Sequence, residues 1–223
     1  VEQVGIVVRP GSDQQFWAHF RPLDEDERRL FTNKDWALRE GRVLANMSQR
    51  IEYIYQKSPE GYGHAVYCAR EWVGDDPFLL MLGDHLYLSA TQEPCAAQVI
   101  RAAIKHNCNL SAMAVTPASQ LHLFGTARGK PLGPRLYQVE LLVEKPSPEV
   151  AERELMTPGL PTGHYLCFFG MHVFTPEIFE ALGYLLREDL RERGEIQLTS
   201  AQEILRQNSL YLAYVIEGTR HDI

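Results

Sequence analysis

The sequence predicts an α/β fold in which helices connect the short apolar strands of a parallel sheet. Short apolar runs alternate with amphipathic stretches along the chain, which is the pattern of such folds. The run Phe78–Leu82 reads FLLML and is apolar on every side, as expected for a central strand covered on both faces. In Thr91–Asn107, apolar residues recur at spacings of three and four, which predicts a helix with one buried face.

The same reasoning extends along the whole chain. Strands are predicted, in order, at Val4–Val8, Ile51–Tyr55, Phe78–Leu82, Ser111–Val115, Leu136–Val143, Leu166–Phe174 and Tyr211–Ile216. Further helices are predicted to start after Thr175 and Thr199, because threonine before a helical pattern is a favoured N-cap. Two segments rich in Gly, Pro and charge, Leu121–Pro134 and Pro146–Pro161, are expected to leave the sheet. No linker or repeat is found, so one domain over residues 1–223 is predicted.

Composition narrows the class of partner. The 223 residues carry a formal net charge of −7, which argues against broad electrostatic binding of nucleic acid or an anionic membrane. The four cysteines are widely spaced without a CxxC pair, so a zinc site is not predicted. No apolar run has the roughly 18 residues of a membrane span, and no signal-peptide pattern is found. We expect a cytoplasmic protein.

A glycine-containing loop, QKSPEGYGHA, follows the predicted strand Ile51–Tyr55 and precedes a helical pattern. Gly61 and Gly63 allow backbone to approach a ligand without interference from a Cβ atom. The helix after them would direct free N–H groups toward an anion. The same residues also suit an ordinary strand-to-helix turn. The chain holds neither a complete dinucleotide fingerprint nor a P-loop.

Charged residues follow two more apolar runs. Asp84 comes after FLLMLG, at the strand end where α/β folds bind ligands, and one carboxylate there suits Mg²⁺ bridged to phosphates; a turn cap is the alternative. Glu144 and Lys145 follow LYQVELLV. As a functional pair, Glu144 would accept hydrogen bonds from the hydroxyls of a polyol and Lys145 would contact phosphate; as a structural pair, they form a solvated strand edge. His85 has both a structural and a substrate-contacting interpretation. No nucleophile motif supports covalent catalysis.

The motifs together resemble a known enzyme family. The stretches that carry the resemblance are EGYGHAVYCAREWVGDDPFLLMLGDHLY, VEKPSPE, FFGMHVFTPEIFEAL, GEIQLTSAQEIL and GTRHDI. In this order and spacing they resemble the sugar-1-phosphate nucleotidylyltransferases, and most of all the bacterial group that joins UTP to glucose-1-phosphate. The resemblance covers nearly the whole chain from Val1. It implies a Rossmann-like three-layer α/β/α nucleotidyltransferase fold with a mixed, mainly parallel central sheet.

The resemblance also assigns roles by position. The residues carried over are Gln56, Gly61 and Gly63 for the nucleotide pocket, Asp84 and Asp222 for Mg²⁺, Gly125, Glu144 and Gly170 for the sugar, and Lys145 for the sugar phosphate. Asp84 and Lys145 would be the catalytic residues. The implied reaction is attack of a sugar-1-phosphate oxygen on the α-phosphorus of a nucleoside triphosphate, with release of pyrophosphate. The implied partners are therefore these two small molecules, without nucleic acid or membrane, and a homo-oligomer is left open.

Some features depart from the family pattern. The glycine-rich loop with Gly-Thr-Arg, expected before Val4–Val8, is not in the sequence, and the chain stops one residue after Asp222, so truncation at both ends is expected. His85 stands where a second acid or Asn is common, and Met171-His172 replaces a basic-aromatic pair. These departures keep three alternatives open: a thymidylyl-, adenylyl- or guanylyl-transferring relative, a non-catalytic nucleotide-sugar-binding domain, and a metal-dependent glycosyltransferase.

Overall fold

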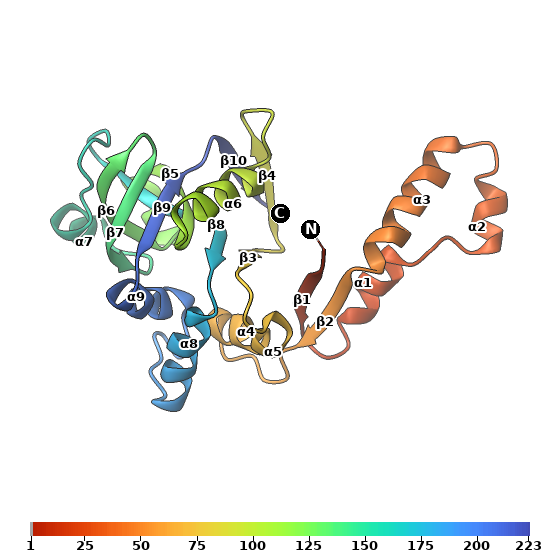
Figure 1. The fold of residues 1–223 in the computed structure, drawn as a ribbon, viewed down its shortest axis with the longest axis horizontal. Helices are drawn as coiled ribbons and strands as arrows, with labels where there is room; N and C mark the ends of the chain where they lie inside the picture. The colour runs from red at the N-terminus through yellow and green to blue at the C-terminus, as the bar shows by residue number, and fades with distance from the viewer. Residues whose placement is uncertain (1) are drawn as a thin grey trace. The chain divides into compact units, whose positions relative to one another are not determined.

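The computed structural model describes residues 2–223 and contains two compact units, Val1–Trp72 and Val73–Ile223. The first unit is built on two parallel strands, β1 (Val4–Val8) and β2 (Ile51–Tyr55), both with the bounds predicted from sequence. Its helices are α1 (Asp13–Phe20), α2 (Glu25–Leu30), α3 (Asp35–Ser48) and α4 (Tyr62–Cys68), with the short α5 (Arg70–Val73) at the boundary in sequence (Figure 1).

The second unit is built on a six-stranded mixed sheet. Its strands, in spatial order, are β3 (Phe78–Met81), β8 (His164–Phe174), β5 (Asn109–Pro117), β9 (Tyr211–Val215), β7 (Leu136–Val143) and β6 (Thr126–Gly133). The mixed sheet confirms the predicted fold class, but the prediction that it is mainly parallel is wrong. Only β5 and β9 run parallel within it, because the β6–β7 hairpin and the long β8 run antiparallel to their neighbours.

Helices cover both faces of this sheet. Leu110 and Ala112 of β5 pack against the apolar side of α6 (Cys95–His106). Ser111 lies between them, and successive strand residues point to opposite faces. Its hydroxyl shares a hydrogen-bonded network with Gln202 of α9 (Leu198–Asn208). Helices α6 and α9 therefore form the outer layers of an α/β/α arrangement. The remaining helices are α7 (Pro148–Glu154), α8 (Glu177–Arg187) and the 3₁₀ helix η1 (Ala118–Leu123).

A separate two-stranded ribbon joins β4 (His85–Ser89) to β10 (Gly218–Asp222) in antiparallel register, with Asp222 opposite His85 and Gly218 opposite Ser89. We call it the β4–β10 ribbon. Neither strand was predicted, because both are short, β4 exposes Leu86 and Leu88, and β10 has no apolar run. The ribbon ends at the two aspartates singled out by the sequence.

Several local predictions are wrong. The strand at Phe78 is half-buried and lies at the edge of the sheet, not at its centre, because within residues 2–223 it pairs only with β8. Segment Leu121–Pro134 does not leave the sheet, since it contains β6; Pro131 is tolerated on this strand beside a register irregularity. Neither threonine is an N-cap: α8 starts after Pro176, and α9 starts at Leu198 after Gln197.

The core between β5, β8, β9 and α9 holds a closed polar network. Ser111 hydrogen-bonds both His172 and Tyr211, and Gln202 Nε2 donates to the Tyr211 hydroxyl at 2.8 Å and lies 3.1 Å from His172 Nδ1. All four side chains are buried. Because a buried polar group that loses its partner is costly, a network of this kind favours one packing arrangement of the core. Burial lowers the pKa of His172 to about 3, so its imidazole is neutral at physiological pH.

Within residues 2–223, none of the helices could span a membrane.

The neutral buried imidazole of His172 predicts acid sensitivity. Unfolded His172 takes up a proton below its ordinary pKa of about 6.5, whereas the folded protein resists protonation down to about 3, so stability falls as pH drops through this window. When the pH is lowered from 7 to 5, we expect His172 to reduce the free energy of unfolding by about 2 kcal/mol. Urea unfolding at both pH values should show a smaller loss in His172→Gln than in wild type. The exposed control His122→Gln should keep the wild-type loss, and equal losses in all three proteins would contradict this account.

Candidate functional site

Two aspartates meet at one end of the β4–β10 ribbon. Asp84 directly precedes β4 and Asp222 ends β10, and the amide of Ile223 donates to the carbonyl of Asp84 at 2.9 Å. Between the two carboxylates lies the His85 imidazole, whose Nε2 is 3.8 Å from Asp84 Oδ1 and 3.3 Å from Asp222 Oδ1. The carboxylates are largely exposed, whereas the His85 side chain is 9% exposed. We call Asp84, His85 and Asp222 the carboxylate cluster.

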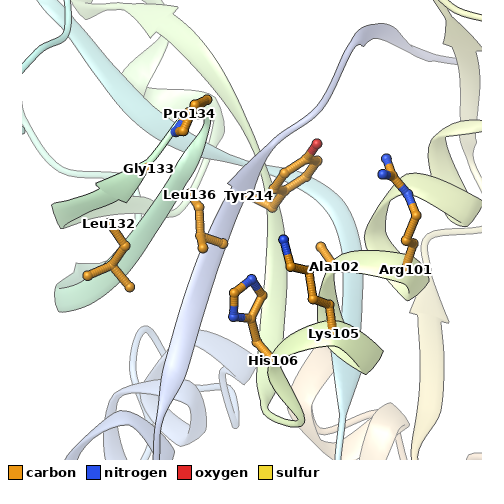
Figure 2. Close-up of a pocket in the computed structure, with 9 residues that line it drawn as sticks. All are labelled: Arg101, Ala102, Lys105, His106, Leu132, Gly133, Pro134, Leu136 and Tyr214. Atoms are coloured by element: carbon orange, nitrogen blue, oxygen red, sulfur yellow. The ribbon is translucent and has the colours of Figure 1, made fainter.

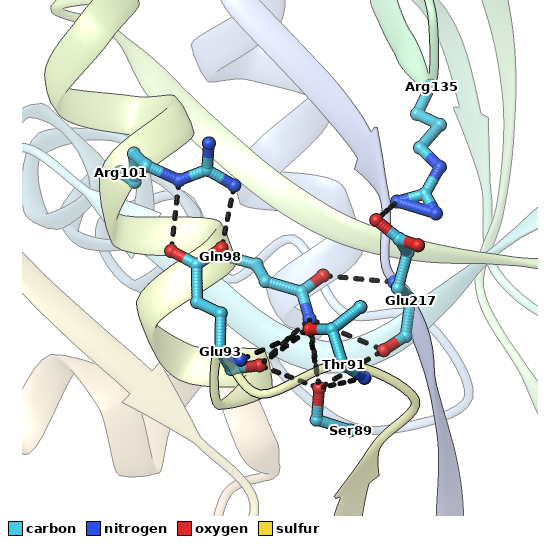
Figure 3. A network of polar contacts seen from close by, with 7 residues as sticks. All are labelled: Ser89, Thr91, Glu93, Gln98, Arg101, Arg135 and Glu217. Atoms are coloured by element: carbon cyan, nitrogen blue, oxygen red, sulfur yellow. Dashed lines mark hydrogen bonds and ion pairs between the residues drawn. The ribbon is translucent and has the colours of Figure 1, made fainter.

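The far end of the ribbon is fixed by a buried glutamine. Figure 3 shows Gln98 of α6 between the two strand ends. Its side-chain oxygen accepts from the amide of Glu217 at 3.0 Å, and its Nε2 donates to the Glu217 carbonyl and to Ser89 Oγ. Glu217 also pairs with Arg135. Because Ser89 ends β4 and Glu217 precedes β10, one side chain holds both strands on α6.

Gly170 lies beneath His85. It has φ of +86°, and a Cβ atom there would lie 2.5 Å from His85 Nδ1 and 2.9 Å from the Tyr87 hydroxyl. The Tyr87 hydroxyl donates to the Gly170 carbonyl at 2.8 Å and lies 3.2 Å from His85 Nδ1. Since its proton is directed to the carbonyl, the hydroxyl oxygen accepts from Nδ1–H. Nε2 of the neutral ring then faces the carboxylates with its lone pair and donates no hydrogen bond to them. Burial, with a smaller contribution from Arg220, lowers the pKa of His85, against the opposing effect of the two carboxylates.

A second cluster surrounds Glu144, and we call Gly125, Glu144, Lys145 and Thr199 the glutamate cluster. Thr199 in the first turn of α9 donates its hydroxyl to Glu144 Oε2 at 2.6 Å, and Lys145 Nζ lies 4.0 Å from Oε1. A Cβ atom at Gly125 would lie 2.5 Å from the Phe168 ring and 2.9 Å from Oε2, so the glycine lets both the ring and the carboxylate pack against this backbone. Glu144 is mostly buried, whereas Lys145 is 42% exposed.

Phe168 of β8 connects the two clusters. Its amide donates to the Gly125 carbonyl at 2.9 Å, and its carbonyl accepts from Arg220 Nη1 at 3.0 Å. The Arg220 guanidinium lies 4.0 Å from the centre of the Phe124 ring, and its Nε lies 3.0 Å from Asp222 Oδ1. The second unit therefore brings together six of the residues predicted from sequence, namely Asp84, Gly125, Glu144, Lys145, Gly170 and Asp222.

The predicted nucleotide loop belongs to the first unit. Gln56 Nε2 donates to the Gly61 carbonyl at 3.1 Å and lies 3.2 Å from His64 Nδ1. Gly61 has φ of +110° and precedes α4, and Gly63 is buried in the first turn of that helix. Gly61 thus meets the backbone demand of a tight strand-to-helix turn. The role of both glycines toward a nucleotide stays a prediction.

Sequence reasoning missed Arg220 and Phe168, and it assigned Thr199 to a helix cap. A signal for Arg220 exists in the sequence, because residues two apart on a strand share a face, and Arg220 precedes Asp222 by two. No local pattern indicates Phe168, whose role depends on the backbone of β8. The Thr199–Glu144 contact joins residues 55 positions apart, so no local pattern reports it either.

The carboxylate cluster suits a hard divalent cation. Within residues 2–223, no three His, Cys, Asp or Glu side chains form a ready-made metal site. Mg²⁺, however, typically takes one or two protein carboxylates and fills its other positions with water and substrate phosphates. Two exposed carboxylates at one ribbon end, one on each side of His85 Nε2, match that requirement.

A pocket of about 410 Å³ lies elsewhere in the second unit, between α6 and the β6–β7 hairpin (Figure 2). Its basic residues are Arg101, Lys105 and His106. Arg101 pairs with Glu93, and Lys105 lies in the last turn of α6, where its positive charge offsets the helix dipole. These two basic side chains have structural roles that need no ligand, so we do not include this pocket in the candidate site.

Comparisons with known proteins define the class. The model of the nucleotidyl transferase family matches residues 29–222, and the chain belongs to this family. Among its relatives, a UTP–glucose-1-phosphate uridylyltransferase of Bacillus subtilis (strain 168) is 34% identical over 218 residues, which cover 98% of this chain and 69% of that protein.

Solved structures show the same fold. An apo UDP-glucose pyrophosphorylase superimposes with a TM-score of 0.82 at 26% identity, covering 99% of this chain and 76% of that one. A UDP-glucose pyrophosphorylase complexed with UDP-glucose gives a TM-score of 0.78 at 26% identity, covering 99% and 75%. The predicted α/β nucleotidyltransferase fold and the recognised family are therefore confirmed, whereas the roles of individual residues remain predictions.

The packing of Gly170 predicts a large effect of a single methyl group. We expect Gly170→Ala to lower the unfolding free energy by about 2–4 kcal/mol, because alanine disfavours positive φ and its Cβ would displace the His85 ring. Urea unfolding midpoints measure the loss. Gly133→Ala is the matched control, since the space around Gly133 is open. A Gly170→Ala protein as stable as that control would show that the close contact with His85 is not real.

Proposed function

We propose that this nucleotidyl transferase uses UTP and glucose-1-phosphate, with Mg²⁺, to make UDP-glucose and pyrophosphate. The family is that of enzymes that transfer nucleotidyl groups. The choice of UTP and glucose is supported by a relative at 34% identity named for these substrates, and by a neighbouring structure described as complexed with UDP-glucose.

The observation that carries the proposal is the link between the two clusters. Asp84 and Asp222 provide oxygen ligands for a cation, and Glu144 and Lys145 provide an acceptor for hydroxyls and a cation for phosphate. A sugar phosphate presents both hydroxyls and phosphate, and the β8 backbone at Phe168 contacts both clusters. One substrate could therefore be held between them.

The proposed reaction needs no protein nucleophile. A phosphate oxygen of the sugar-1-phosphate forms a bond to the α-phosphorus of UTP, and the bond from that phosphorus to the oxygen bridging to the β-phosphate breaks, releasing pyrophosphate. Lys145, 42% exposed, would offset negative charge on the attacking phosphate. A bound Mg²⁺ would neutralise charge on the nucleotide phosphates. The remaining contribution of the protein is to align the two anions.

Recognition of the sugar would depend on Glu144. Its Oε2 is held by the Thr199 hydroxyl, so the carboxylate is oriented before substrate arrives. Its Oε1 lies beside Lys145 at 4.0 Å, where it could accept from sugar hydroxyls while the ammonium contacts phosphate. Gly125 beside it has no side chain that would displace this carboxylate.

The metal assignment predicts a catalytic loss in Asp84→Ala. Pyrophosphate release with Mg²⁺ and glucose-1-phosphate, measured with each nucleoside triphosphate in turn, should be fastest with UTP and should fall at least about 100-fold in this variant. The protein should be expressed from its complete coding sequence. Asp75→Ala removes an exposed aspartate at the opposite end of β3 and should retain wild-type turnover. Near wild-type turnover of Asp84→Ala would refute the metal assignment, and no turnover of the wild type with any nucleotide would refute the reaction.

The sugar assignment predicts a selective change in KM. Glu144→Ala should raise the KM for glucose-1-phosphate about 10- to 100-fold, because hydrogen bonds to a charged group are lost, and should leave the KM for UTP within about threefold. Steady-state kinetics with each substrate varied separately measure both. Glu140→Ala, at an exposed position of β7 four residues before Glu144, is the control and should change neither. Equal increases in both KM values would place Glu144 outside the sugar site.

A further inference from the structure

Two side chains lie close to the same oxygen of Asp222. Arg220 Nε lies 3.0 Å from Asp222 Oδ1, and His85 Nε2 lies 3.3 Å from the same atom. Asp222 itself is 60% exposed, whereas Arg220 and His85 are 11% and 9% exposed. An exposed carboxylate is therefore paired with a guanidinium that is itself largely buried, and the imidazole beside it donates no hydrogen bond to it.

Both side chains are anchored on β8. Arg220 Nη1 donates to the carbonyl of Phe168, and the guanidinium packs on the Phe124 ring. His85 is connected through the Tyr87 hydroxyl to the carbonyl of Gly170. These two carbonyls lie at the register irregularity of β8, where its pairing with β5 shifts between Ser111 and Met113. A β-bulge commonly redirects groups in this way beside functional sites.

The positive charge of Arg220 would by itself weaken the binding of a cation at Asp222. A guanidinium 3.0 Å from a carboxylate that is to bind a divalent cation repels that cation. If charge were all that mattered, the site would bind metal more tightly without Arg220. The geometry suggests the opposite, because a freely rotating exposed aspartate must lose rotamer freedom when it binds.

We propose that Arg220 is a positioning residue that holds Asp222 by its ion pair with Oδ1 and leaves Oδ2 for the divalent cation. This inference rests on the metal site of the proposed function and adds to it the group that orients the ligand. It also couples the cation site to the glutamate cluster, because the Phe168 residue that accepts from Arg220 donates to Gly125.

The test is the affinity of the protein for Mn²⁺ in the absence of substrate. It is measured by calorimetry or from the electron paramagnetic resonance signal of Mn²⁺. Arg220→Lys keeps the positive charge but loses the planar fork, and Arg220→Met keeps the stem without charge. We expect both variants to bind Mn²⁺ about 10-fold more weakly, in the range seen when groups that orient metal ligands are removed. Unchanged binding in Arg220→Lys, or tighter binding in Arg220→Met, would overturn the positioning role.

Two further sets of variants separate the possible failures. Arg135→Met removes another arginine–carboxylate pair of this unit, the one with Glu217, and should leave Mn²⁺ affinity unchanged. Asp222→Asn and Asp84→Asn test the metal site itself. Loss of binding in the aspartate variants without any loss in the Arg220 variants overturns the positioning role alone. Unchanged binding in the aspartate variants refutes the metal site on which the proposed function rests. Thermal unfolding of each variant confirms that it is folded.

Discussion

The arrangement of the candidate site depends on the irregularity in β8 around Gly170. In a regular ladder, the carbonyls of this segment would pair with β5; here Ser111 pairs with His172 and Met113 with Phe168. The Gly170 carbonyl accepts from Tyr87, and the Phe168 carbonyl accepts from Arg220. Only glycine fits at position 170, because φ is positive and the His85 ring lies where a Cβ would be. A strand of the core thereby fixes the exposed end of a separate ribbon.

The same core fixes the glutamate cluster from the other side of the sheet. Gln202 of α9 enters the buried network with Tyr211 and His172, and Thr199, three residues earlier on α9, donates to Glu144. Residues three apart on a helix lie on neighbouring positions of one face. The buried network therefore sets the position of the helix that orients Glu144. His172, a departure from the family pattern in the sequence, serves this network and does not face solvent.

Sequence patterns predicted several local elements of the fold better than the long-range pairing between them. The β1, β2 and β7 strands have the predicted bounds, because alternating or apolar runs indicate which residues of a strand are buried. Phe78–Leu82 looked central, yet an apolar run cannot reveal how many neighbours a strand has. The β4–β10 ribbon was missed since its pairing joins residues far apart in sequence. Asp84, Glu144 and Asp222 were found through motifs, whereas Arg220 and Thr199 act through contacts that only the folded chain creates.

The central claim is that Asp84 and Asp222 form a divalent-cation site at the end of the β4–β10 ribbon. The most direct measurement is the anomalous scattering of Mn²⁺ in crystals of the protein grown with UDP-glucose. The account predicts an anomalous peak about 2.1–2.3 Å from a carboxylate oxygen of each aspartate, with Arg220 still paired with the other oxygen of Asp222. A Mn²⁺ peak bound only at other residues would contradict it.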